Sequence, residues 1–60
     1  MKVRQFVNFL GKEVMTTGVV IRQAEYEGND CYLVHFEHEG VKYAGWWIVK
    51  LCKVVDNGRG

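Results

Sequence analysis

The sequence contains no proline, so every reversal of the chain must be made by other residue types. Glycine supplies the positive φ angles that tight turns need, and asparagine and aspartate also tolerate them. These residues recur at the spacing of short strands, at Gly11, Gly18, Gly28-Asn29-Asp30, Gly40 and Asn57-Gly58. The pattern predicts a series of short strands joined by tight turns.

An excess of charge of either sign is also lacking. The chain has eight lysine and arginine residues against seven aspartate and glutamate residues, a formal net charge of +1. A domain that binds nucleic acid usually presents a clearly basic face or stripe. The composition alone therefore does not predict a polyanion-binding protein, although a local basic patch stays open.

Long apolar runs are missing as well. No stretch approaches the roughly 20 apolar residues of a membrane span. The opening Met1-Lys2-Val3-Arg4-Gln5 is not followed by the apolar run of a signal peptide. With only two cysteines in addition, we expect a reduced cytoplasmic protein.

Apolar residues are nevertheless plentiful, at 48% of the sixty residues, which is enough for a folded core. This length predicts a single domain over residues 1–60. A domain of this size buries only about 60% of the surface of its unfolded chain, so we expect modest stability.

The clearest strand signal lies between the two cysteines, in Cys31–His38 and Val41–Ile48. Side chains alternate between the two faces of a strand. In the first segment one face is largely apolar and predicts the core side, namely Tyr32, Val34, Phe36 and His38. Glu39-Gly40 interrupts the pattern and predicts a tight hairpin turn.

Trp46 and Trp47 are adjacent, so a regular strand must point them in opposite directions. A domain of sixty residues has little room to bury a tryptophan on both faces of one sheet. We expect one of the two to be buried and the other exposed. The exposed one is a candidate contact residue; alternatively, it covers the open end of a barrel or a partner subunit.

The first ten residues fit two structures. Val3, Phe6, Val7 and Leu10 follow the helical i, i+3, i+4, i+7 pattern, with Gly11 placed to end a helix. Valine and phenylalanine also suit a strand. We favour a short helical segment packed on the sheet.

The remaining segments predict short strands. A turn and short strand are expected over Gly11–Thr17, then a strand over Gly18–Tyr26 and a turn at Glu27–Asp30. After the central hairpin we expect one turn of tight helix near Val49–Leu51 and a last strand at Lys53–Val55. The fold class is therefore mainly β, with four or five antiparallel strands curled into a small, partly open barrel.

This layout resembles the SH3-like barrels, which include the KOW and Tudor-like domains. The resemblance rests on Gly11-Lys12-Glu13-Val14, Gly18-Val19-Val20, Tyr32–Phe36 with Gly40, Trp47 and Leu51. It implies a fold rather than a function. The layout also looks like the plasmid-borne type of dihydrofolate reductase, an SH3-like barrel that acts as a tetramer. That family's Val-Gln-Ile-Tyr stretch is absent from Lys42–Ile48, so no catalytic residue carries over.

Residues that bind metals do not have the spacing of a metal site. Cys31 and His35 share a face but lie about 13 Å apart at ~3.3 Å per residue, whereas two zinc ligands are at most about 4 Å apart. His38 lies on the opposite face from His35. We therefore expect no metal and no cofactor, and we interpret Cys52 as a core residue.

Catalytic groups are equally absent from the pattern. Glu37 and Glu39 surround the histidines with negative charge, which does not favour a reactive thiolate beside them. The acidic residues lie near turns and predict a solvated face. We find no phosphate-cradling glycine motif.

We therefore predict a binding module without catalytic activity, whose partner is a protein. The predicted contact surface consists of Tyr26, Tyr43 and the exposed member of Trp46 and Trp47, with Arg22 and Lys42 at its rim. Two alternatives remain. Basic residues lining one side beside the aromatics would bind single-stranded nucleic acid, namely Lys12, Arg22, Lys42, Lys50 and Lys53. Self-association would allow an enzyme site at a subunit junction. Chains this small are also common in phage and plasmid genomes.

Overall fold

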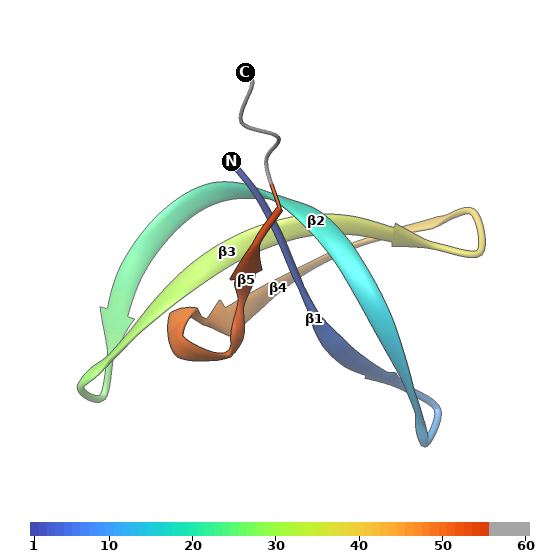
Figure 1. The fold of residues 1–60 in the computed structure, drawn as a ribbon, viewed down its shortest axis with the longest axis horizontal. Helices are drawn as coiled ribbons and strands as arrows, with labels where there is room; N and C mark the ends of the chain where they lie inside the picture. Colours follow the sequence, from blue (N-terminus) through green and yellow to red (C-terminus); the bar gives the residue numbers. More distant parts are fainter. Residues whose placement is uncertain (56–60) are drawn as a thin grey trace.

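The fold is a single antiparallel sheet, seen in a computed structural model that describes residues 1–55 (Figure 1). The strands are β1 (Lys2–Phe9), β2 (Lys12–Tyr26), β3 (Asn29–His38), β4 (Val41–Ile48) and β5 (Lys53–Val54), with a 3₁₀ turn, η1 (Val49–Leu51), before β5. Their order in the sheet is β4-β3-β2-β1-β5. The prediction of a mainly β chain is confirmed. The predicted turn at Asn57-Gly58 lies outside the described residues.

The N-terminal segment is a strand, so the predicted helical segment over residues 1–10 is wrong. β1 pairs with β2 without interruption from Lys2↔Val19 to Phe9↔Lys12. A helix of ten residues is marginal in water unless packing supports it. The stripe that favoured a helix is only partly buried, because Phe6 and Leu10 are exposed. A continuous ladder with β2 therefore replaces the helix.

β2 is one long strand of fifteen residues, where the sequence predicted a turn and two separate strands. Gly18 lies in its middle and makes no turn. Its pairing with β3 shifts register between Val20 and Arg22, so Ile21 is the extra residue of a β-bulge. A bulge bends its strand and increases the local twist. The length and the bulge together allow β2 to arch over the molecule (Figure 1).

All three hairpins close through two-residue loops that end in glycine. Both loop residues have positive φ in each case: 52° and 84° at Leu10-Gly11, 51° and 83° at Glu27-Gly28, and 54° and 80° at Glu39-Gly40. Positive φ at both central residues defines the type I′ turn, whose twist matches that of the strands it joins. The predicted turns at Gly11, Gly28 and Gly40 are confirmed.

The core shows that the sheet curls on itself. Val3, Val34 and Trp47 are the buried residues of one apolar cluster, and they come from β1, β3 and β4. Two strands separate β1 from β4 in the sheet, so their side chains meet only because the twisted sheet folds over. We call the side that carries this cluster the inner face and the opposite side the outer face.

The chain end follows the prediction closely. After β4 the 3₁₀ turn η1 carries the chain across the molecule, and β5 pairs with β1 through Val3↔Val54 and Arg4↔Lys53. The backbone N–H of Val55 then donates to the carbonyl of Lys2 at 3.0 Å. The sheet stays open, with β4 and β5 as its two edges.

Gly18 provides a test of this packing, because a β-carbon there would overlap Val34 Cγ1 and lie 2.8 Å from the carbonyl oxygen of His35. We expect Gly18→Ala to lower the free energy of unfolding by about 1–3 kcal/mol, the usual cost of overpacking a core. Gly45→Ala is the matched control, since its nearest neighbour would be 3.7 Å away. Urea denaturation of both variants measures the difference. Equal losses in the two variants would contradict the close approach at Gly18.

A candidate contact surface on the outer face

The two adjacent tryptophans separate as the sequence predicts. Trp47 pairs with Tyr32 and lies on the inner face, 5% exposed. Trp46 pairs with Leu33 and points to the outer face, 52% exposed. Trp46 is therefore the candidate contact residue of the pair, and Trp47 is a core residue.

Trp46 borders a small apolar hollow of about 410 Å³, which we call the Trp46 hollow. Ala24 and Cys31 are directly opposite each other on β2 and β3. Both side chains are small, so they leave a depression in the surface of the sheet between the larger rings of Tyr26 and Trp46. Glu25 also lines this depression. Tyr26 is itself 68% exposed. Two residues predicted from the sequence, far apart in the chain, thus border one hollow.

Cys31, which forms the floor of the Trp46 hollow, is a largely buried thiol. Cys31 is 8% exposed and its thiol donates a weak hydrogen bond to the carbonyl of Asn29, with Sγ 3.7 Å from the oxygen. The cysteine is free of any disulfide. A buried thiol in apolar surroundings behaves as a small hydrophobic group. The hollow therefore suits an apolar group.

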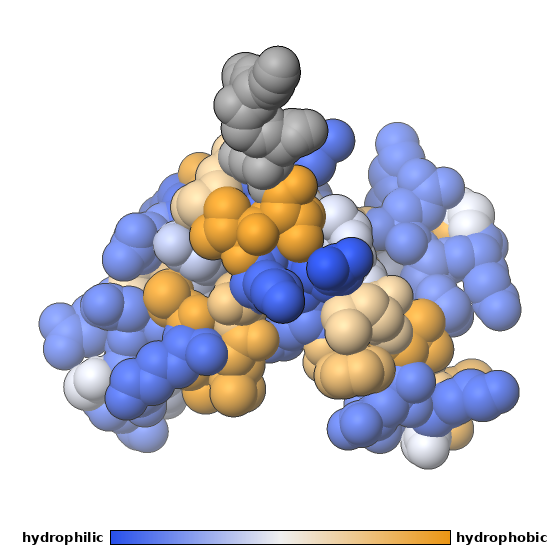
Figure 2. Space-filling view, in the orientation of Figure 1, coloured by the Kyte–Doolittle hydropathy of each residue, from blue (hydrophilic) through white to orange (hydrophobic). Residues whose placement is uncertain are grey.

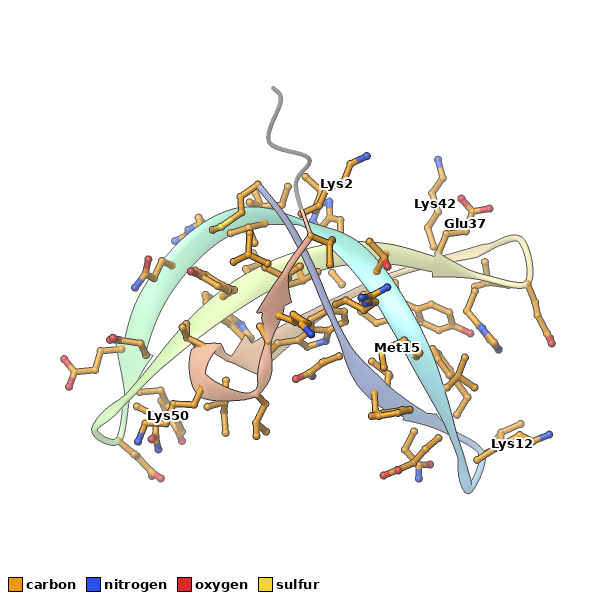
Figure 3. The ribbon with its side chains drawn as sticks, viewed as in Figure 1. Lys2, Lys12, Met15, Glu37, Lys42 and Lys50 are labelled. Carbon is orange, nitrogen blue, oxygen red and sulfur yellow. The ribbon has the colours of Figure 1, made fainter. Side chains whose placement is uncertain are left out.

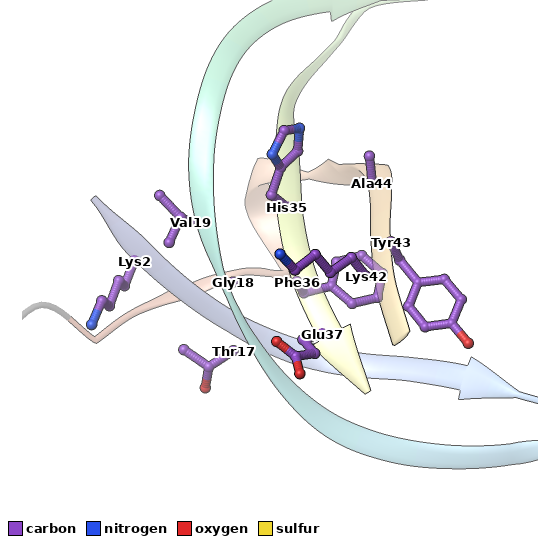
Figure 4. Close-up of a pocket in the computed structure, with 10 residues that line it drawn as sticks. All are labelled: Lys2, Thr17, Gly18, Val19, His35, Phe36, Glu37, Lys42, Tyr43 and Ala44. Atoms are coloured by element: carbon purple, nitrogen blue, oxygen red, sulfur yellow. The ribbon is translucent and has the colours of Figure 1, made fainter. Parts of the chain in front are cut away.

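A second, larger hollow of about 750 Å³ lies further along the outer face (Figure 4). One row of cross-strand neighbours crosses its lining, namely Lys2, Val19, His35 and Ala44. Glu37 and Lys42 form a second row, directly opposite each other on β3 and β4. Figure 3 shows these two side chains on the same side of the sheet. This hollow mixes charged and apolar groups, and it is wider and more polar than the Trp46 hollow.

The predicted rim residues lie on the outer face with Trp46. Arg22 is paired with Leu33, which in turn is paired with Trp46, so the three form one row across the sheet. Lys42 is two strand positions from Ala44 on the same face of β4. The structure therefore brings together Tyr26, Trp46 and Arg22, with Lys42 further along the same face.

Tyr43 does not belong to this surface. It lies on the inner face, where its ring is 5.5 Å from the rings of both Phe36 and Phe9. Odd-numbered residues of β4 point inward with Trp47, and Tyr43 follows this alternation. Of the six residues in the predicted surface, Tyr43 thus lies on the other face and Trp47 is buried.

The aromatic group around Tyr43 was missed by sequence reasoning. Phe9 stacks on His38 with ring centroids 3.9 Å apart and planes at 9°, and it also contacts Phe36 at 6.2 Å. His38 Nε2 lies 3.8 Å from the carboxylate of Glu39. Phe9 does not belong to the helical pattern of Val3, Phe6, Val7 and Leu10, so the helical interpretation assigned it to neither the buried nor the exposed side. Its assignment as a strand would have placed Phe9 inward with Val3 and Val7.

Of the five basic residues predicted for nucleic-acid binding, Arg22, Lys42 and Lys53 share the outer face, whereas Lys12 and Lys50 lie apart. Figure 3 shows Lys12 near the β1–β2 hairpin and Lys50 near the opposite end of the molecule. The register places Lys53 of the predicted set on the outer face opposite Arg4, and it adds two cations that were not predicted, Lys2 opposite Val19 and Arg4 opposite Thr17. Together with Arg22 and Lys42 these make five cationic residues, against the two acidic residues Glu13 and Glu37 on that face.

Much apolar surface remains uncovered. Figure 2 shows apolar side chains reaching the surface in separate groups with charged side chains between them. The large apolar residues that are more than one-third exposed include Phe6, Met15, Val41, Leu51 and Val54 in addition to Trp46 and Tyr26. Single exposed apolar residues are normal. The Trp46 hollow differs because its apolar groups surround a concavity.

Metal-binding chemistry finds no support in residues 1–55, where no three histidine, cysteine, aspartate or glutamate side chains group closely enough to hold an ion. The same part of the chain has no helix long and apolar enough to cross a membrane. Comparisons with protein-family models, with curated proteins and with solved structures found no match.

Cys52 packs against the core cluster, as predicted, and burial raises the pKa of its thiol. The folded state then holds the proton to a higher pH than the unfolded state does. The resulting stabilisation is complete below the unfolded pKa and is lost as the pH rises through the folded pKa. We therefore expect iodoacetamide at mildly alkaline pH to alkylate Cys52 more slowly in the folded chain than in urea.

In a Cys31→Ala variant, Cys52 is the only thiol that iodoacetamide can alkylate. Mass spectrometry then measures the rate of its alkylation as the pH is raised. The thiolate is the reacting form, so the folded chain should reach its half-maximal rate at a higher pH than the unfolded chain. Identical pH profiles in the two states would contradict the burial of Cys52.

Proposed function

We propose that this chain is a non-catalytic binding module that recognises a protein through the Trp46 hollow. The observation that carries this proposal is the half-exposed Trp46 ring beside an apolar concavity that Tyr26 also borders. Tryptophan and tyrosine are enriched among the few residues that dominate the energy of protein interfaces. Such residues act most strongly where an apolar group of the partner fills a pocket beside them.

The chemistry of the Trp46 hollow indicates the partner group. Its lining is apolar apart from the Glu25 side chain and the Tyr26 hydroxyl. An aliphatic or aromatic side chain fills such a space and displaces water at little cost. Arg22 lies in the same row as Trp46, where it adds a charge at the edge of the contact. We infer that the partner inserts one apolar side chain and carries polar groups around it.

A second candidate function, binding of single-stranded nucleic acid, is favoured by the charge of the outer face. By the register, five cationic residues and the acidic residues Glu13 and Glu37 share that face with Trp46 and Tyr26. Glu25 adds one further acidic group at the Trp46 hollow. Stacking of bases on exposed aromatic rings beside backbone-tracking cations is the usual mode of single-strand binding. The net charge of the whole chain hides this asymmetry, because other acidic residues lie elsewhere, with Glu27 and Glu39 in hairpin turns and Asp30 on the other face.

We also propose that the fold is of the SH3-like type expected from the sequence. Support comes from five antiparallel strands in one curled sheet and from a 3₁₀ turn directly before the last strand. Domains of this architecture serve many unrelated functions. The proposal of a binding module therefore rests on the Trp46 hollow and gains nothing from the fold.

Protein recognition is tested by selecting displayed peptides on the immobilised chain and measuring their affinity by isothermal titration calorimetry. We expect Trp46→Ala to weaken binding at least tenfold, since the loss of an anchor of this kind costs about 2 kcal/mol or more. Phe6→Ala is the matched control, because Phe6 is 58% exposed on β1 and does not border the hollow. We expect its effect to stay within about twofold.

Selected peptides should share one apolar position. Peptides that bind Trp46→Ala as well as the original chain would overturn the proposed site. Failure to enrich any peptide over an unrelated β domain would overturn protein recognition itself.

Nucleic-acid binding is tested by fluorescence anisotropy with a labelled single-stranded oligonucleotide at 50 and 200 mM salt. If two to three phosphates are contacted, affinity should fall about tenfold between these concentrations. The double variant Arg22→Gln, Lys42→Gln should bind more weakly and show a smaller salt dependence. Lys12→Gln with Lys50→Gln removes the same charge from elsewhere in the molecule and should leave binding nearly unchanged. Equal losses in the two double variants would point to unspecific attraction and reject this function.

A further inference from the structure

The two edges of the sheet differ sharply in length. β5 is two residues long, whereas β4 forms the other edge over eight residues. Natural proteins protect long edges with proline, bulges, charged side chains or a covering element. β4 pairs with β3 without a register shift, contains no proline and carries a single charged residue, Lys42. This edge has little protection against pairing with another strand.

The backbone groups that point outward from β4 follow from its hairpin. A two-residue type I′ turn is closed by a hydrogen-bonded pair of its flanking residues, which at Glu39-Gly40 are the paired His38 and Val41. Hydrogen-bonded pairs alternate along an antiparallel ladder, so the backbone N–H and C=O groups of the odd-numbered residues of β4 point toward β3. The N–H and C=O groups of the even-numbered residues face away from the sheet, namely Lys42, Ala44, Trp46 and Ile48.

Only the last of these four residues has another partner in the described part of the chain. The carbonyl of Ile48 accepts a hydrogen bond from Cys52 Sγ at 3.5 Å. Outside the strand ladders, no hydrogen bond within residues 1–55 uses the backbone of Lys42, Ala44 or Trp46. Three consecutive outward positions therefore present both a donor and an acceptor.

We propose that β4 pairs antiparallel with β4 of a second copy of this chain, about a two-fold axis at Ala44. This register places Ala44 opposite Ala44 of the copy and Lys42 opposite Trp46 of the copy. Each opposed pair exchanges two backbone hydrogen bonds, so all three outward positions are satisfied. A register centred on Gly45 would instead need the groups of Ile48, whose carbonyl is already engaged.

The side chains fit this register on both faces. The small Ala44 side chains meet at the axis without a clash, and the two Lys42 ammonium groups come to the exposed Trp46 rings of the other copy. A cation over an indole ring is attracted to it. On the inner face, Tyr43 is opposite Gly45 of the copy, which leaves room for the tyrosine ring. The two sheets then form one continuous sheet with both outer faces on the same side.

This pairing does not rest on the proposed function, because it is argued from the edge of β4. It shares the Trp46 ring with that function but leaves the Tyr26 side of the Trp46 hollow open. Its test is the mass of the chain in solution. Sedimentation velocity from roughly 1 to 100 μM should show a dimer whose fraction rises with concentration. A chain that stays monomeric over this range overturns the proposal, including the case of a monomer that pairs its edge with an extended peptide.

Ala44→Lys tests the position of the axis. It sets two lysines directly opposite each other in the dimer, and like charges in opposed pairs repel. We expect the dimerisation constant to fall at least tenfold. Thr17→Lys is the matched control, because Thr17 is exposed on the outer face of the interior strand β2. A dimer that tolerates Ala44→Lys, or that loses as much with Thr17→Lys, contradicts pairing at β4.

A cross-link tests the register without relying on a charged variant. In a Cys31→Ala, Cys52→Ala background, Ala44→Cys should form a disulfide-linked dimer under mild oxidation. Opposed residues in a hydrogen-bonded pair have Cα atoms about 5.5 Å apart, within the range of a disulfide. Lys42→Cys is the control, because the two copies of residue 42 would lie about 13 Å apart along the strands. Cross-linking of Lys42→Cys at an equal rate would overturn the register.

Discussion

The contact between β1 and β4 on the inner face is the constraint on which the rest of the structure depends. Strands lie about 4.8 Å apart in a sheet, so β1 and β4 would be roughly 14 Å apart in a flat one. Val3 and Trp47 nevertheless belong to one buried cluster. The long β2 must therefore bend, and its bulge at Ile21 and its bare Gly18 allow it to do so. Three type I′ turns keep the strands paired through the twist.

The curl also determines which side chains are available for contact. It buries the inner face of β4 at Trp47 and turns Trp46 outward. Tyr43 is held inward in the aromatic group with Phe9 and Phe36. On the outer face the pairing of two small residues, Ala24 and Cys31, leaves the Trp46 hollow between larger rings. The candidate site is thus a consequence of which residues the strand register sets opposite each other.

Local patterns in the sequence predicted the features of the fold that depend only on residues close together in the chain. The alternation in residues 31–48 predicted the central hairpin and the division between Trp46 and Trp47. Glycines that recur at the spacing of short strands predicted the three turns. Each of these features depends on neighbours within a few positions, so the sequence shows them directly.

The failures concern features that depend on distant partners. Residues 1–10 fit a helical stripe, and only the ladder with β2 decides that they form a strand. Gly18 resembles a turn glycine, but its role is to let Val34 of another strand approach. The predicted contact surface joined Tyr43 and Tyr26 because both are aromatic, without assigning Tyr43 to the inner or the outer face. Strand parity within β4 was sufficient to separate Tyr43 from Trp46, whereas the contact of Tyr26 with the hollow needed the β2–β3 register.

The small core connects stability to binding. Few side chains are fully buried, and a net contribution of about 1 kcal/mol for each hydrogen bond in the ladders must offset the cost of ordering the chain. Any partner that binds only the folded state stabilises it in proportion to the logarithm of its concentration. A strand added at β4 would supply hydrogen bonds to three outward positions, and a group in the Trp46 hollow would cover apolar surface. Because the chain buries so little surface of its own, both kinds of contact would raise the stability of the folded state as well as bind a partner.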